Sequence, residues 1–206
     1  MKVLMLNGSP HPKGCTYTAL MAVSDALQKE NVETEMLYLG KEAVPSCIAC
    51  GQCDKTGRCF RKDGVNDILD RLEEFDALVF GSPVYYAAAS GQITSFLNRL
   101  FYAGRGRFAH MLGASVVSCR RAGETSAFDQ LNKYFTISGM SIVGSMYWNQ
   151  VHGNTPEEVR QDTEGMESLR VLGENMAWLL KCMEAGRAAG VSVPNNSKIT
   201  NTNFIR

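Results

Sequence analysis

The chain has 206 residues, of which 45% are hydrophobic and 20% charged, and its 21 basic residues balance 21 acidic ones. This length suffices for one domain with its own core, and a net charge of zero argues against a nucleic-acid-binding surface. The apolar start at residues 1–6 is too short for a signal peptide, and no stretch is long enough to span a bilayer. We therefore expect a cytoplasmic protein, in which structural disulfides are rare.

Five short apolar runs alternate with amphipathic segments along the chain. The runs cover residues 3–6, 34–39, 77–81, 114–118 and 141–146. They are rich in Val, Ile and Leu without strict alternation, which is typical of parallel strands buried on both faces. The pattern predicts a doubly wound, three-layer α/β sandwich with a five-stranded parallel sheet over residues 1–185, followed by an extended tail over residues 186–206.

Helical spacing of apolar residues separates these runs, for example at residues 65–72 and 93–101. The last helix has a clear start signal, with Thr155 as N-cap, Pro156 at the first helical position and Glu158 completing a capping box. An apolar stripe then continues to Met183, so we expect one long helix.

One connection is unusually long. Residues 40–63, inserted after the second predicted strand, show no regular pattern, although such connections usually take about 2–6 residues. This loop holds four of the seven cysteines: Cys47, Cys50, Cys53 and Cys59. A metal site and free thiols both stay open as interpretations, whereas a disulfide is disfavoured in a reducing compartment.

Ligands of a doubly wound sheet bind at the carboxyl ends of its strands, and the first segment there covers residues 7–18. It lacks both the G-x-G-x-x-G spacing of a dinucleotide site and the Lys-Ser or Lys-Thr of a P-loop. Its hydroxyls and the amides at a helix N-terminus suit a phosphate monoester. The alternative is a strand-to-helix turn that binds nothing.

Three further segments follow later strands. Residues 81–91 contain Tyr85 and Tyr86 among small residues, which suits the face of a flat ring, although such tyrosines are also common as core or surface residues. Residues 118–124 contain Arg120 and Arg121, which can meet a carbonyl or phosphate or simply be solvated. In residues 148–153 we expect His152 to make a structural hydrogen bond, with a place beside the substrate as the alternative.

The segments N-G-S-P-x3-G-x-T and G-S-P-V-Y-Y together resemble those of the NAD(P)H-dependent FMN reductase family of flavodoxin-like proteins. The resemblance covers residues 1–153 and implies that the first segment holds the FMN phosphate, through Ser9, His11, Gly14, Cys15, Thr16 and Thr18. It implies ring contacts from Pro83, Val84, Tyr85, Tyr86 and Ala87, and from Ser118, Arg120 and Gly123 beside them. His11 and Cys15 replace residues that are often Arg and Asn in that family.

The spacing C-x2-C-x2-C-x5-C of the cysteine loop is similar to that of the iron–sulfur flavoproteins within this family, which implies a [4Fe–4S] cluster held by Cys47, Cys50, Cys53 and Cys59. Zinc is the rival, but its ligands usually come as two separated pairs. Free thiols in a flexible loop are the remaining alternative.

The resemblance implies an FMN-dependent oxidoreductase that passes electrons from NAD(P)H through FMN to a small-molecule or protein acceptor. The alternative is an iron–sulfur flavoprotein that only exchanges electrons with protein partners. We expect no obligatory catalytic residue, because the cofactor performs the chemistry. We also expect a homodimer or higher homo-oligomer, because ring sites in this family usually lie near a subunit interface and the tail ends in the apolar pair Phe204-Ile205.

Overall fold

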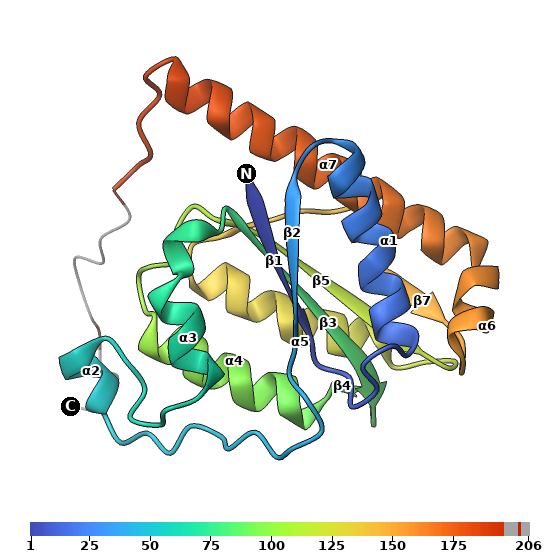
Figure 1. The fold of residues 1–206 in the computed structure, drawn as a ribbon, viewed down its shortest axis with the longest axis horizontal. Coiled ribbons are helices and arrows are strands. Elements are labelled where there is room, and N and C mark those ends of the chain that lie inside the picture. Colours follow the sequence, from blue (N-terminus) through green and yellow to red (C-terminus); the bar gives the residue numbers. More distant parts are fainter. Residues whose placement is uncertain (196–201, 203–206) are drawn as a thin grey trace.

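The central sheet has the strand order of a flavodoxin. In the computed structural model, which describes residues 1–195 and 202, the strands pair in the order β2-β1-β3-β5-β6 and each of these pairs is parallel. Their bounds are β1 (Lys2–Asn7), β2 (Glu33–Tyr38), β3 (Ala77–Tyr85), β5 (Leu112–Cys119) and β6 (Ser141–Ile142). The strand order reverses between β1 and β3, which confirms the predicted doubly wound sheet and places the ligand edge at the carboxyl ends of these strands (Figure 1).

The fifth position of the sheet is divided between two short strands. β6 pairs only with the start of β5, and β7 (Gln150–His152) pairs with its end at Val117–Cys119. The prediction of one strand over residues 141–146 is therefore wrong beyond Ile142. The Ser145 hydroxyl accepts from the Tyr147 amide at 3.3 Å and donates to the Tyr147 carbonyl at 2.7 Å, which turns the chain away from the sheet. Asn149 bridges the gap, because its Nδ2 donates to the Ser115 carbonyl at 3.1 Å.

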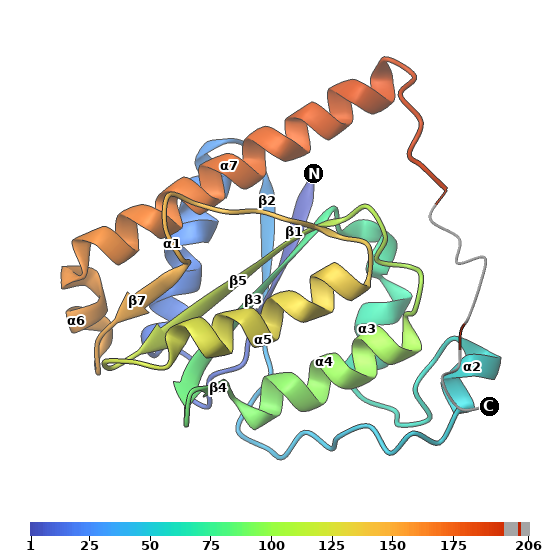
Figure 2. The ribbon, with the colours of Figure 1, turned by 180° about the vertical axis from the view of Figure 1, so that it is seen from behind.

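Helices cover both faces of the sheet, as Figures 1 and 2 show from opposite sides. One face carries α1 (Cys15–Lys29) and α7 (Thr163–Ala188), and the other carries α3 (Gly64–Asp70), α4 (Gly91–Ala103) and α5 (Glu124–Ile137). The apolar stripe of each helix explains this arrangement. Leu20 and Leu172 are buried with Met5 on the first face, and Phe80 stacks on Phe135 on the second at 4.6 Å between ring centroids.

The C-terminal helical region consists of two helices rather than one. Thr155 accepts from the Glu158 amide at 3.2 Å, so the predicted N-cap is confirmed, but α6 (Pro156–Gln161) ends after six residues. Asp162 then caps α7, accepting from the Gly165 amide at 3.0 Å. Helix α7 continues to Ala188, past the expected start of the tail at residue 186.

The expected apolar end of the tail, at residues 204 and 205, lies outside the described residues. No helix in the described part of the chain is long and apolar enough to cross a membrane.

The cysteine loop leaves β2 at the ligand edge and then runs away from it. It passes below α4 and reaches the short helix α2 (Gln52–Thr56), from which the chain returns to α3 (Figure 1). A single turn of 3₁₀ helix, η1 (Leu72–Glu74), completes the connection to β3. The loop therefore has a local helix that its sequence did not indicate.

Candidate functional site

The turn between β1 and α1 leaves the start of the helix open. Gly14 is the N-cap residue of α1, and in the described part of the chain no side chain makes a capping hydrogen bond there. Ser9 folds the turn, since its amide donates to Asn7 Oδ1 at 3.0 Å and its hydroxyl accepts from the His11 amide at 3.1 Å. An uncapped helix N-terminus presents amide donors and the positive end of the helix dipole to an anion. This turn is therefore suited to a phosphate group.

Two predicted phosphate contacts, Thr16 and Thr18, are already hydrogen-bonded within the protein. The Thr16 and Ser118 hydroxyls lie 2.8 Å apart and both residues are buried, so the first and third predicted segments meet here. One hydroxyl donates to the other, which leaves one O–H proton of the pair for a further acceptor. The Thr18 hydroxyl donates to the Gly14 carbonyl at 3.2 Å and stabilises the first turn of α1.

The two remaining predicted residues of this segment differ in their surroundings. His11 is exposed at the tip of the turn. The Cys15 thiol donates to the Gly153 carbonyl at 3.6 Å, and burial raises its pKa. Cys15 therefore offers a phosphate its backbone amide rather than its side chain.

The predicted ring segment forms a tight hairpin at the end of β3. β4 (Ala88–Ala89) pairs antiparallel with Val84 and Tyr85. The two turn residues, Tyr86 and Ala87, both have left-handed backbone angles, with φ of 50° and 59°. Turns of this kind normally contain Asn or Gly, and a non-glycine residue there costs roughly 1–2 kcal/mol. Such strain is typical of a ligand-binding loop. The Tyr86 side chain at this turn lies fully in solvent.

Hydrogen bonds of two serine hydroxyls join this hairpin to the turn between β1 and α1. Ser90 donates to the Gly8 carbonyl at 2.7 Å, and the Ser90 amide donates to the Ser82 hydroxyl at 2.9 Å. A Cβ on Gly8 would lie 2.6 Å from that of Ile93, so only glycine allows this approach. We did not predict a role for Ser82 or Ser90, although the Ser90-Gly91 start of a helix was a visible signal.

The third predicted segment, residues 118–124, contacts the hairpin at Gly123. Gly123 has a φ of 91°, and a Cβ there would lie 2.9 Å from the Cα of Ala87 and 3.2 Å from a methyl group of Val84. Arg120 is exposed, so of the three residues predicted here only Ser118 and Gly123 contact the other two segments. Burial and the Glu124 carboxylate raise the pKa of the neighbouring Cys119 to about 12, which keeps it a neutral thiol.

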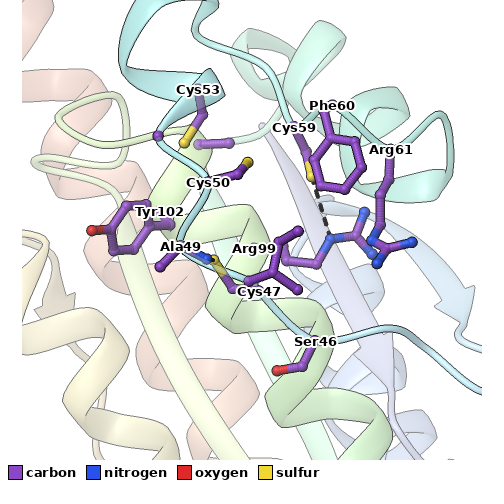
Figure 3. A pocket seen from close by; sticks show the side chains of 13 residues that line it. Ser46, Cys47, Ala49, Cys50, Cys53, Cys59, Phe60, Arg61, Arg99 and Tyr102 are labelled. Carbon is purple, nitrogen blue, oxygen red and sulfur yellow. Dashed lines mark hydrogen bonds between the residues drawn. The ribbon is translucent and has the colours of Figure 1, made fainter.

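All four loop cysteines line one pocket beside α4 (Figure 3). Its walls are mostly apolar and include Ile48, Phe60 and Tyr102, while Arg61 and Arg99 supply positive charge. Left-handed residues Ala49 and Gly51 turn the chain between the first three cysteines. Burial raises the pKa of Cys53, and the adjacent Asp54 adds to this effect.

Cys59 is the most firmly held of the four. Its amide donates to Asn66 Oδ1 at 3.0 Å, and Asn66 Nδ2 donates back to the Cys59 carbonyl at 2.9 Å. Arg99, whose side chain is 1% exposed, donates through Nε to the Cys59 sulfur at 3.4 Å (Figure 3). The same guanidinium contacts the Asp63 carboxylate at 2.5 Å and the Pro45 carbonyl at 3.2 Å.

The pocket contains an unsatisfied donor. Among the residues described, Arg61 Nε is buried and makes no hydrogen bond. Arg61 beside four thiols is suited to a group with several negative charges, such as a cluster bound by four thiolates, because it would offset part of that charge, while Arg99, already paired with Asp63, donates to the Cys59 sulfur. Sequence reasoning missed both arginines, since neither belongs to a recognisable motif.

The four thiols are not gathered as tightly as the ligands of a bound zinc ion. Tetrahedral zinc with Zn–S bonds of about 2.3 Å requires sulfur atoms about 3.8 Å apart. Within the described part of the chain, no three of these four sulfur atoms lie within 4.8 Å of one another. An iron–sulfur cluster is bound by thiolates on different irons and takes a wider set of ligands.

The cysteine pocket lies towards the C-terminal half of α4, whereas the predicted FMN-binding segments lie at the start of this helix. Ser90 caps the helix at the ligand edge, and Arg99 contacts Cys59 nine residues later. With a rise of 1.5 Å per residue, about 14 Å of helix separate the two. The four cysteines therefore lie away from the ligand edge, because the loop extends along the outside of α4 (Figure 2).

Comparison with known proteins agrees with this geometry. The model of the NADPH-dependent FMN reductase family matches residues 1–155. An iron–sulfur flavoprotein of Methanocaldococcus jannaschii is 30% identical over 192 residues, covering 89% of this chain and 100% of that protein. One of Methanosarcina thermophila is 24% identical, covering 91% and 99%.

Among solved structures, the NAD(P)H:quinone oxidoreductase of Methanothermobacter marburgensis shares the fold. Its TM-score is 0.66 at 16% identity, over 85% of this chain and 96% of that one. The family match and the full-length relatives lead to one conclusion. The chain belongs to the NADPH-dependent FMN reductase family, among relatives that are named iron–sulfur flavoproteins.

Proposed function

We propose that this protein is an FMN-dependent oxidoreductase that takes electrons from NAD(P)H and holds a [4Fe–4S] cluster in the cysteine pocket. The observation that carries this proposal is the convergence of Cys47, Cys50, Cys53 and Cys59 on one pocket that also contains Arg61 and Arg99. The names of the curated relatives support the cluster, and the family match supports FMN.

Different segments at the ligand edge would bind the phosphate and the ring of FMN. The open start of α1, together with the Ser9 turn, would hold the phosphate, and the Thr16–Ser118 pair has one O–H proton to donate. The hairpin of Val84 to Ala87 would lie along the ring. Its turn has left-handed backbone angles, and the hydrogen bond between Ser90 and Ser82 holds it in place. When bound, FMN accepts a hydride and can release electrons singly, which a cluster requires.

A purely protein-to-protein electron carrier is the second candidate. The exposed cysteine loop favours it, because Cys47 and Cys50 are on the surface and within reach of a partner. The exposed Tyr85 and Tyr86 favour an enzyme, because they leave the ring region open to small molecules. Steady-state oxidation of NADH or NADPH, with and without a quinone, distinguishes the two candidates.

The decisive experiment is anaerobic purification with reconstitution, followed by assay of FMN, iron and acid-labile sulfide. We expect one FMN and about four irons and four sulfides per chain. Changing Cys50 to Ser should remove the iron but leave FMN bound, whereas changing the exposed Cys182 on α7 should alter neither. Absence of iron from the reconstituted protein would refute the cluster, and FAD in place of FMN would refute the flavin site.

A further inference from the structure

Three potential metal ligands converge where β5, α5 and β7 meet. Cys119 ends β5, Glu124 begins α5 and His152 ends β7. One ligand atom from each lies within 4.8 Å of the other two, and this is the one such group of three among the residues that the structure describes. These residues do not belong to the cysteine pocket or to the predicted FMN contacts.

The distance between sulfur and oxygen in this group matches a metal site. The Cys119 thiol donates a hydrogen bond to Glu124 Oε2 at 3.6 Å between sulfur and oxygen. In a tetrahedral zinc site, with Zn–S of about 2.3 Å and Zn–O of about 2.1 Å, the two ligand atoms are about 3.6 Å apart. Thiolate, imidazole and carboxylate are also the three ligand types that zinc takes in proteins.

A fourth residue orients the histidine. Asp162 Oδ2 lies 3.3 Å from His152 Nδ1 and accepts from the His152 amide at 2.7 Å. Its other oxygen accepts from the Gly165 amide, so the carboxylate is fixed at the start of α7. A proton on Nδ1, donated to Asp162, would leave the lone pair of Nε2 free for a metal, and metal-binding histidines commonly donate their other ring N–H to a carboxylate in this way.

We propose that Cys119, Glu124 and His152 form a binding site for a divalent cation of the zinc class, with Asp162 as the carboxylate that orients His152. The Cys119 proton is released when the metal binds, because the thiolate is the ligand. The His152 side chain is 42% exposed, so solvent can reach the fourth coordination position. Because Glu124 follows Gly123, which contacts Ala87, the cation would brace the segment that supports the ring hairpin.

The test must separate this site from the four loop cysteines, which can also take zinc. We would use full-length protein with reconstituted iron, and in parallel a variant in which all four loop cysteines are changed to Ser, each dialysed against Zn²⁺ and then against metal-free buffer. Elemental analysis should find one zinc per chain that is lost in Cys119→Ser and in His152→Ala. The exposed Cys182→Ser change is the control and should keep the zinc.

Two further measurements keep the proposal open to refutation. Asp162→Asn retains a residue that can cap α7, and it should weaken zinc binding 10–100-fold in a competition with a chelator. Zinc should also raise the thermal midpoint of the parent protein but not that of His152→Ala, with folding of each checked by circular dichroism. Equal zinc retention in the parent and in His152→Ala, or no zinc in either, would overturn the proposal independently of the iron content.

Discussion

At the scale of single residues, the buried Arg99 links the fold to the cysteine pocket. A fully buried arginine is rare unless its charge is paired. Here the guanidinium is shared among Asp63, the Pro45 carbonyl and the Cys59 sulfur. Asp63 in turn caps α3 by accepting from the Val65 amide. One side chain therefore connects α4, the start of α3 and both ends of the cysteine loop.

We expect Arg99→Met to release iron from the reconstituted protein without loss of FMN. The change removes the donor to Cys59 and leaves Asp63 without its partner, so it should also lower the free energy of unfolding by about 2 kcal/mol. Arg99→Lys should restore part of the iron retention. The control is Arg105→Met, since this exposed arginine pairs with Asp54 at 3.6 Å near the same loop. Iron loss equal to that of the control would contradict this role.

The strained hairpin gives a second test at this scale. Ala87→Gly should raise the free energy of unfolding by about 1 kcal/mol, because glycine adopts the left-handed φ of 59° without a Cβ penalty. Ala88→Gly, one residue later in β4, should lower it. Urea unfolding of both variants measures the difference, and stabilisation by neither or by both would show that the turn is not strained.

At the scale of elements, helices α1 and α7 approach closely at a glycine. A Cβ on Gly173 of α7 would lie 2.6 Å from the Cβ of Ala26 and 2.8 Å from the Val23 carbonyl of α1. A Cβ on Gly186, in the same helix, would lie 3.9 Å from the Cβ of Val191 and, apart from its chain neighbours and the backbone of its own helix, within 4 Å of no other residue that the structure describes. Alanine favours a helix over glycine by roughly 1 kcal/mol wherever space permits.

The same substitution should therefore have opposite effects at these two positions. Gly173→Ala should destabilise the protein by about 1–3 kcal/mol through overpacking. Gly186→Ala should be neutral to stabilising, by up to about 1 kcal/mol. Chemical denaturation of the matched pair checks this, and stabilisation by Gly173→Ala would show that the two helices have room to separate.

A charge network joins β1, β2 and η1 at the amino end of the sheet. Glu35 of β2 accepts from Arg71 through both oxygens, at 2.9 and 2.8 Å, and contacts Lys2 of β1 at 2.8 Å. The Arg71 guanidinium, followed by Lys2, lowers the pKa of Glu35 from 4.5 to about 2. The network adds charge pairing where β2 forms an edge of the sheet.

The lowered pKa predicts a loss of stability in acid. The contribution of Glu35 is fully present above its unfolded pKa near 4.5 and disappears as the pH falls towards 2. Because the group is partly exposed, we expect about 1 kcal/mol. Glu35→Gln should therefore differ from the parent in unfolding free energy at pH 7 but not near pH 2. Glu33→Gln, at a more exposed partner of Lys2, is the control and should change little at either pH.

At the scale of the whole molecule, several large apolar side chains are exposed beside α7. Met146, Tyr147 and Trp148 lie in the segment between β6 and β7, and Trp178 projects from α7. Asn175 Nδ2 donates to the Gly144 carbonyl at 2.9 Å, which holds this segment against α7 near Trp178. Exposed aromatic groups that gather in this way are typical of interaction surfaces.

We expect the protein to form at least a dimer, and we expect Trp178→Glu to shift it towards the monomer. Light scattering coupled to gel filtration, at micromolar concentration, measures both. Trp178 is largely exposed in the single chain, so the change should leave the unfolding free energy of the monomer nearly unaltered. Monomer mass for the parent protein would contradict the prediction.

Much of the fold follows from local features of the sequence. Continuous apolar runs predict buried parallel strands, and the alternation with helices predicts the doubly wound sheet, because each signal depends on the spacing of residues close in the chain. The Thr155 cap and the segments at residues 7–18 and 81–91 were identified for the same reason, because each is a local pattern of neighbouring residues. The spacing of the four cysteines indicated a shared site before any contact was known.

Contacts between distant residues decided the rest. Residues 141–146 look like a strand, but only a Ser145 turn and the Asn149 bridge to β5 show that the chain leaves the sheet and returns. The contact of Arg99 with Cys59 joins residues 40 positions apart, and Cys119 meets His152 across the ends of two strands. Whether a charged or thiol side chain is buried beside a partner depends on the packing of whole elements, which no local pattern encodes.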